Sequence, residues 1–224
     1  MAHNDTLVQE LYEAAAHVGY TKTRRHPSTV PFIFQSRQKK DIINLEDTAT
    51  QLISALSFIA QLKAEGQQIL FVATKPEAKR MVREQAELID MPFVTERWLG
   101  GTLTNSKELR QRVDRLMDLQ VKKDNNELVY QTKKEKLMIE REIERLERKF
   151  GGLRNMKKNP SALFVVDPKK EYIAVNEARQ MNIPVIALAN TDCDINVVTH
   201  PIVANDTNLS SITYITQKVA DTLK

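Results

Sequence analysis

The chain has 224 residues, 42% of them hydrophobic, which is enough to bury a substantial core. Its single cysteine, Cys193, excludes an intrachain disulfide and suits a reducing compartment, so we expect a cytoplasmic protein. The apolar runs fall far short of the roughly 20 residues of a membrane-spanning helix. The amino terminus lacks the basic start and apolar stretch of a signal peptide. We therefore expect neither a membrane nor a secretory role.

The formal net charge is only +4, but the charge is unevenly distributed. No Asp or Glu occurs between Ala14 and Lys40, and the stretch 21–40 contains six cations. Local cation density governs phosphate binding, so this stretch predicts a polyanionic partner. Pro27 and Pro31 disfavour a helix, and we expect an extended segment that Phe32 and Phe34 anchor. The alternative is a solvated loop with an apolar anchor. The cations are Lys22, Arg24, Arg25, Arg37, Lys39 and Lys40.

Further along the chain, strand and helix patterns alternate. Apolar residues recur at helical spacing over 45–59 and 78–89, and again in 168–181 and 208–223. Short apolar runs rich in β-branched residues, typical of buried parallel strands, occupy 69–74, 162–167 and 184–190. This alternation predicts an α/β fold with a mainly parallel sheet.

One charged region, 104–150, interrupts the alternation and predicts an antiparallel helical hairpin. Leu109, Val113 and Leu116 form an apolar stripe on its first arm, and 139–150 carry a matching stripe. Thr132 and Glu135 form a capping box after a polar turn at 123–126. Glycine pairs at 100–101 and 151–152 bracket the hairpin. We therefore expect a core of 1–102 and 151–224 and a protruding hairpin of 103–150.

The string ERWLGGTLTNSK, residues 96–107, is the most distinctive motif before the hairpin. Trp98 beside Arg97 and the glycine turn could stack on an exposed base, but it could equally pack in the core. Polar residues at 104–106 can cap the outgoing helix. The sequence leaves both roles of Trp98 open.

Catalytic and cofactor motifs are not found. No glycine-rich phosphate loop of either usual form follows a strand. Lys75, after the first strong strand, could meet a phosphate, and with Asp167 or Asp192 it forms the alternative hypothesis of a flavodoxin-like enzyme or ligand-binding protein. We expect strand-end aspartates to cap turns and helices rather than bind a cation. The four histidines show no ligand spacing with Cys193. We predict no enzyme, no cofactor and no metal.

Several strings resemble one family, the bacterial-type second protein of the small ribosomal subunit (the S-two family). The resemblance spans nearly the whole chain, and RWLGGTLTN followed by a helical hairpin and FGG is highly specific. The strings are AAAHVGY (14–20), PFIFQSRQKKDIINLEDT (31–48), ILFVATK (69–75), RWLGGTLTN (97–105), FGGLRNMKKNPSALFVVD (150–167) and NIPVIALANTD (182–192).

The resemblance implies a structural constituent of the small subunit, with a flavodoxin-like core and a protruding coiled-coil hairpin. It further implies binding to ribosomal RNA between head and body, small-subunit protein neighbours, and help in docking the messenger-binding protein S-one. A location in the small ribosomal subunit follows, with an organelle left open. A non-ribosomal interaction protein remains an alternative. The predicted RNA-binding residues are Lys22, Arg24, Arg25, His26, Arg37, Lys39, Lys40, Lys75, Arg97, Trp98, Asn105 and Lys107.

Overall fold

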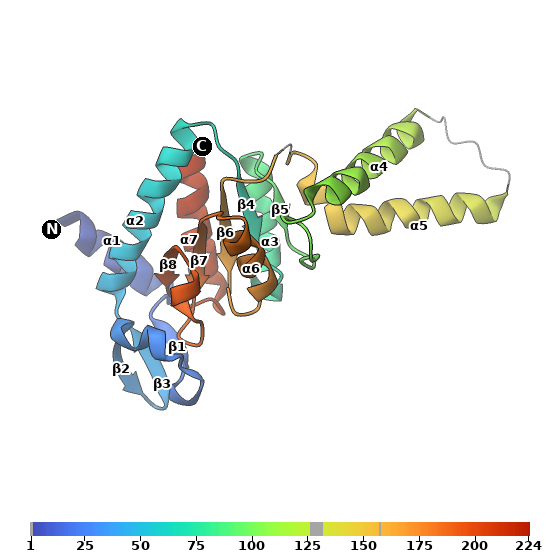
Figure 1. Cartoon of the computed structure of the whole chain (residues 1–224). Coiled ribbons are helices and arrows are strands. Elements are labelled where there is room, and N and C mark those ends of the chain that lie inside the picture. The colour runs from blue at the N-terminus through green and yellow to red at the C-terminus, as the bar shows by residue number, and fades with distance from the viewer. Residues whose placement is uncertain (1, 126–131, 157) are drawn as a thin grey trace.

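The computed structural model describes residues 2–125, 132–156 and 158–224 (Figure 1). Its helices are α1 (Ala2–Glu13), α2 (Leu45–Ala64), α3 (Pro76–Leu88), α4 (Ser106–Asp124), α5 (Lys133–Phe150), α6 (Tyr172–Gln180) and α7 (Leu209–Leu223). Its strands are β1 (Val18–Thr21), β2 (Ile33–Arg37), β3 (Lys40–Ile43), β4 (Ile69–Val72), β5 (Phe93–Val94), β6 (Ala162–Val166), β7 (Val185–Ala189) and β8 (His200–Val203). Four short 3-10 helices are η1 (Lys22–Arg24), η2 (Pro27–Phe32), η3 (Gly151–Leu153) and η4 (Ile195–Val197).

The main sheet has five parallel strands in the order β5-β4-β6-β7-β8. Numbered along the chain within this sheet, the order is 2-1-3-4-5, which is that of flavodoxin-like folds. The three predicted strands are its centre, β4, β6 and β7. Strands β5 and β8 were not predicted. The α/β fold with a parallel sheet is confirmed.

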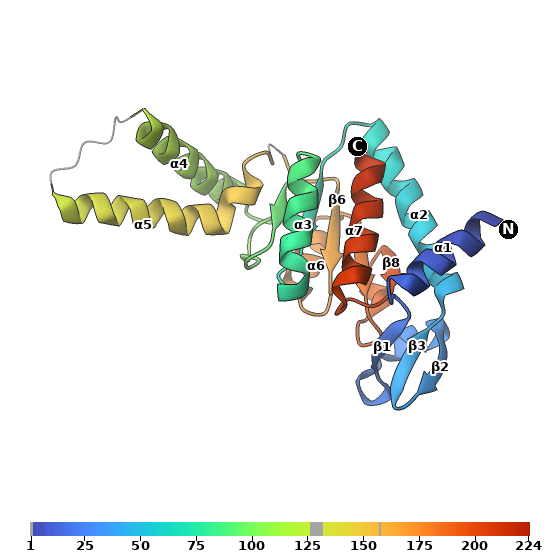
Figure 2. The same cartoon turned by 180° about the vertical axis from the view of Figure 1, so that it is seen from behind.

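Two apolar layers cover the two faces of this sheet. Side chains alternate along each strand, so Ile69 and Phe71 face one layer while Leu70 and Val72 face the other. The first layer is built by α2, α3 and α7, seen in front in Figure 2, and the second by α6 and the base of the α4–α5 pair. The predicted helices α2, α3, α6 and α7 are therefore confirmed. Asn208 caps α7 by accepting a hydrogen bond from the Ser210 N–H at 2.8 Å.

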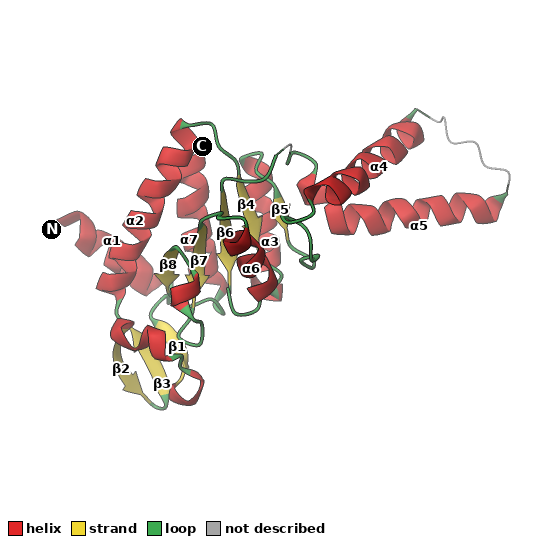
Figure 3. Cartoon of the chain, viewed as in Figure 1, coloured by secondary structure: helices red, strands yellow, loops and turns green. Residues whose placement is uncertain are grey.

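A second, antiparallel sheet of three strands, in the order β1-β3-β2, lies below β7 and β8 in Figure 3. The expectation of one extended segment over 21–40 is wrong, because η1 and η2 interrupt it. Proline disfavours an α-helix, but its fixed φ is compatible with the short 3-10 turn that begins at Pro27. Phe32 does pack against a buried cluster, whereas Phe34 is 70% exposed and anchors nothing in this chain.

The helices α4 and α5 form a two-helix arm that extends away from the sheet (Figure 1). Their ends near the sheet pack together through the predicted apolar stripes, and Leu116 is fully buried there. Thr132 caps α5 as predicted, since its hydroxyl accepts a hydrogen bond from the Glu135 N–H at 3.2 Å. Helix α4 continues to Asp124, so the polar turn begins later than predicted, and Asn126 lies outside the described residues.

Candidate nucleic-acid interface

The small sheet gathers five exposed cations at one end. Its register pairs Lys40 with Thr21 on one side and with Arg37 on the other. The Lys22 N–H donates to the Lys39 carbonyl oxygen at 3.1 Å, which places these two residues side by side. Arg24 lies over the Tyr20 ring, 5.1 Å from its centroid. We call this group the basic tip: Lys22, Arg24, Arg37, Lys39 and Lys40, all exposed.

A tight turn between β2 and β3 presents part of the basic tip. Gln38 and Lys39 have φ values of 50° and 67°, the left-handed conformation that a two-residue hairpin turn requires at both central positions. This turn places Arg37 opposite Lys40. All five cations lie within one short stretch of the sequence, and the pairing of the strands brings them together in space.

Arg25, the sixth cation of the predicted stretch, has an internal partner. Its guanidinium forms a two-pronged ion pair with Asp41, with the Nε–Oδ2 bond at 2.7 Å, and its Nη2 also donates to the Ser36 hydroxyl at 2.8 Å. Asp41 is fully buried. Hydrogen bonds from Arg25 and Ser36 hold the pKa of Asp41 below its ordinary value, although burial opposes this. Arg25 thus ties the segment that follows β1 to β2 and β3, the strands that carry part of the basic tip.

Lys75 also has internal partners, at the carboxyl ends of the main-sheet strands. Its Nζ donates to Asp206 Oδ2 at 2.8 Å and to Asp167 Oδ2 at 3.3 Å. Asn190 donates to the other oxygen of Asp206 at 2.9 Å. Burial acts to lower the pKa of Lys75, but the charge and hydrogen bond of Asp206 outweigh it, so the pKa is raised and the lysine stays charged. The structure places Lys75 inside an ion-pair cluster, where 10% of its side chain is exposed.

Strand β1 covers this cluster. The Tyr20 N–H donates to the Thr191 hydroxyl at 3.0 Å, and the Tyr20 hydroxyl lies 3.4 Å from Lys75 Nζ. A Cβ at Gly19 would stand 2.7 Å from the Thr191 methyl carbon, so only glycine permits the approach. The edge where flavodoxin-like sheets hold ligands is therefore filled by Lys75 and covered by β1, which disfavours the ligand-binding alternative.

The strand-end aspartates accept backbone hydrogen bonds, form ion pairs or, in the case of Asp167, do both. Asp167 accepts a hydrogen bond from the Lys170 N–H, and Asp194 caps η4 through the Asn196 N–H, both at 3.0 Å. The capping expectation is wrong for Asp206, which is fully buried against Lys75, and for Asp192, which pairs with Lys169 at 3.0 Å. Within the described ranges, no group of three or more His, Cys, Asp or Glu side chains is arranged so that it could hold a metal ion.

Trp98 packs in the core, which is one of the two roles that the sequence left open. It is 5% exposed, and its Nε1 donates to Glu177 Oε1 at 3.0 Å. Glu177, on α6, also accepts hydrogen bonds from the backbone N–H groups of Gly101, Leu103 and Thr104 at 2.8, 3.0 and 3.3 Å. The RWLGGTLTN loop thus wraps around one buried carboxylate. Sequence reasoning missed Glu177 because it lies more than 70 residues further along the chain.

Three predicted residues in this loop and at the start of α4 are exposed: Arg97, Asn105 and Lys107. Arg97 follows β5, the edge strand beside the arm, while Asn105 and Lys107 stand at the start of α4 (Figure 1). Asn105 occupies the cap position of α4 without a side-chain cap hydrogen bond. These residues form a second group, separate from the basic tip.

His26 is half-buried, with its Nδ1 3.9 Å from Asp194 Oδ1.

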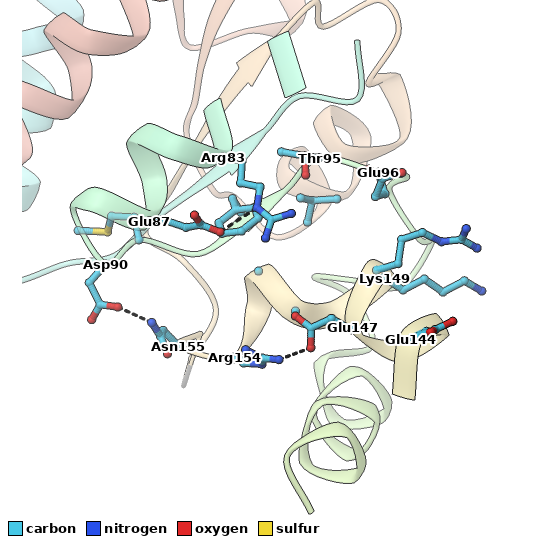
Figure 4. Close-up of a pocket in the computed structure, with 16 residues that line it drawn as sticks. Arg83, Glu87, Asp90, Thr95, Glu96, Glu144, Glu147, Lys149, Arg154 and Asn155 are labelled. Carbon is cyan, nitrogen blue, oxygen red and sulfur yellow. Dashed lines mark hydrogen bonds and ion pairs between the residues drawn. The ribbon is translucent and has the colours of Figure 1, made fainter. Parts of the chain in front are cut away.

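A third charged surface lines a hollow of about 550 Å³ between α3, β5 and the base of α5 (Figure 4). Here cations and acids alternate. Arg83 pairs with Glu87 at 2.8 Å, and Arg154 pairs with Glu147. This balanced charge contrasts with the basic tip, where the neighbouring carboxylate, Asp41, is buried and neutralised.

In the part of the chain that the structure describes, no helix combines the length and the apolar character needed to cross a membrane.

Comparisons with known proteins show which family the chain belongs to. The family model for ribosomal protein S2 matches residues 11–224. The small ribosomal subunit protein uS2 of Mycobacteroides abscessus is 41% identical over 216 residues, which cover 96% of this chain and 78% of that protein. The chain therefore belongs to the ribosomal protein S2 family and is a structural, non-enzymatic constituent of the small ribosomal subunit that serves translation.

Proposed function

We propose that this protein binds small-subunit ribosomal RNA chiefly through the basic tip. The observation that carries the proposal is the convergence of its five exposed cations at the end of the small sheet. The proposal uses five of the six predicted cations and omits Arg25, because Arg25 is paired with Asp41. Exposed lysine and arginine side chains bind phosphates by displacing condensed counterions, without a need for base recognition.

The second exposed group, Arg97, Asn105 and Lys107, supplies further contacts in this proposal. Glu177 fixes the loop that precedes α4, so this group stands on an ordered support. Arg97 and Lys107 would contact phosphates, and the Asn105 amide would donate a hydrogen bond to a sugar or phosphate oxygen. We include His26 as a further contact next to the basic tip, since it follows Arg24 by two residues. Lys75, Trp98 and Arg25 are left out, since each is held by internal partners.

The arm has a different role in this proposal. We treat residues 103–150 as a protruding antiparallel coiled coil and the rest of the chain as the core domain. Four apolar side chains of the arm are between 43% and 61% exposed, which favours contacts to neighbouring small-subunit proteins. These side chains are Met117, Val121, Leu137 and Met138. The messenger-binding protein S-one is included among the proposed neighbours on family resemblance alone.

Salt dependence tests the RNA-binding proposal. Dissociation constants of the full chain for its own small-subunit RNA are measured over a series of salt concentrations. Replacing the five cations of the basic tip with Gln should reduce the slope of log K against log salt by up to about 1 per cation. A matched control replaces five cations on or directly after α2, α3 and α7 and should leave the slope unchanged: Lys63, Arg80, Arg83, Lys218 and Lys224. Equal slopes for the two variants would refute the proposal.

Cosedimentation tests the non-ribosomal alternative. We expect most of the chain in a cell lysate to sediment with small subunits. A chain found mainly away from them would favour the alternative.

A further inference from the structure

A hollow of about 360 Å³ lies beside the basic tip, between α6 and the segment that follows β1. Its volume falls within the ~300–1,000 Å³ that small-molecule sites occupy in proteins. We call it the tyrosine pocket and define it by Arg24, His26, Lys169, Tyr172, Asn176 and Asp194. Arg24 belongs to both surfaces, so the pocket opens next to the cations that the proposed function assigns to RNA.

Tyr172, the first residue of α6, gives the pocket an open aromatic wall. It is 59% exposed, and its hydroxyl makes no hydrogen bond within the described part of the chain. An exposed ring of this kind offers a face on which a base can stack, whatever the identity of the base.

Asn176 stands one helical turn further along the same side of α6. It is exposed, and among the described residues its amide has no hydrogen-bond partner either. Residues four apart on a helix are neighbours on its surface, so a base that stacks on Tyr172 comes within reach of this amide. The amide both donates and accepts, as the edges of nucleobases do.

The charges of the pocket favour a nucleotide over a bare anion. Two carboxylates line it: Asp192 pairs with Lys169 at 3.0 Å, and Asp194 Oδ1 lies 3.9 Å from the Nδ1 atom of His26. A free phosphate would meet these two carboxylates, whereas a base presents N–H donors that carboxylates accept. The guanidinium of Arg24 is exposed at the rim of the pocket, where it can bind the phosphate of the nucleotide.

We propose that the tyrosine pocket holds one unpaired nucleotide of the ribosomal RNA, with its base stacked on Tyr172 and its phosphate beside Arg24. This inference rests on the proposed function and adds a base-binding site to its electrostatic contacts. Recognition of unstacked bases by exposed aromatic rings is a common way in which proteins bind single-stranded RNA.

The test measures dissociation constants of the full chain for its own small-subunit RNA across a salt series. Tyr172→Ala should weaken binding by roughly 5- to 100-fold at every salt concentration, since stacking is lost. It should leave the slope against salt unchanged, because no cation is removed. Tyr172→Phe keeps the ring and should bind as the unaltered chain does. Tyr12→Ala, which removes a tyrosine of similar exposure (62%) on α1, is the matched control and should have no effect.

Each other outcome has a distinct meaning. If Tyr172→Ala binds as tightly as the unaltered chain, and binding is steeply salt-dependent, the pocket inference is wrong while the proposed function stands. If the unaltered chain shows no salt-dependent binding, the proposed function fails first. Equal losses for Tyr172→Ala and Tyr12→Ala, or for Tyr172→Ala and Tyr172→Phe, would overturn the stacking role. Chemical probing of the RNA should reveal one base edge that the unaltered chain protects and the Tyr172→Ala chain does not.

Discussion

Trp98 and Glu177 are joined by a 3.0 Å hydrogen bond from the indole Nε1 to the carboxylate, although they lie 79 residues apart in the chain. The same carboxylate accepts three backbone N–H groups of the loop that leads to the arm. Both oxygens are therefore fully engaged by donors. This single side chain ties α6 to the base of the arm.

Glu177→Gln should lower the free energy of unfolding by about 2–4 kcal/mol. The glutamine NH2 group would face two N–H donors, and buried donors would be left without an acceptor. Urea titration of the two chains measures the difference. Glu84→Gln, an exposed control on α3, should cost less than about 0.5 kcal/mol, and a similarly small effect at Glu177 would contradict the structure.

The contribution of Glu177 should also depend on pH. Burial acts to raise its pKa, but the hydrogen bonds from Trp98 and the loop backbone outweigh burial and hold the pKa below its ordinary value. A carboxylate with a lowered pKa stabilises the folded state above its unfolded pKa, which is about 4.3 for glutamate, and loses this effect as pH falls through the folded pKa. The stability difference between the unaltered chain and Glu177→Gln should therefore be constant from pH 8 down to about pH 5 and shrink below that. A difference that grows on acidification would contradict this assignment.

Lys75 and Asp206 should behave as a buried ion pair. Either Lys75→Met or Asp206→Asn should cost about 3–5 kcal/mol, because each leaves an opposite charge without its main partner. The double variant should cost about 1–3 kcal/mol less than the sum of the two single variants. The exposed pair Arg80–Glu84 is the control, and its coupling should be much smaller than that of Lys75 and Asp206. Additive costs at Lys75 and Asp206 would show that the pair is not formed.

Much of the core follows from the sequence because its signals are local. A strand buried on both faces is a continuous apolar run, which identifies β4, β6 and β7 directly. The remaining strands of the main sheet lack this signal, since β5 has two residues and β8 begins with His200 and Pro201. These two segments are strands because they pair with β4 and β7, and not because of their composition.

The candidate site is less predictable because its partners are distant in sequence. The cation stretch indicates an anion-binding surface. Only the folded small sheet shows that Asp41 is buried beside Arg25. From the sequence alone, Arg25 is therefore grouped with its exposed neighbours. Lys75 looks like a free strand-end lysine until Asp206, 131 residues away, is placed beside it. The open ring of Tyr172 has no sequence signal, because a tyrosine on an amphipathic helix usually packs.

Arg25 and Arg37 should separate stability from RNA binding. Arg25→Gln leaves the buried carboxylate of Asp41 without its cation and should cost about 3–5 kcal/mol of unfolding free energy. Arg37→Gln removes an exposed cation and should change stability by less than about 0.5 kcal/mol while lowering the salt slope of RNA binding by about 1. Urea titration and salt-dependent binding measure the two effects. The reverse pattern would place Arg25 on the RNA.

The central claim, that the basic tip holds ribosomal RNA, is tested most directly by a structure of the assembled small subunit containing this chain. We predict that most of the five cations of the basic tip lie within about 4 Å of phosphate oxygens, the distance of an ion pair. A small subunit in which the basic tip faces solvent or another protein, with the RNA bound elsewhere on the chain, would contradict the claim.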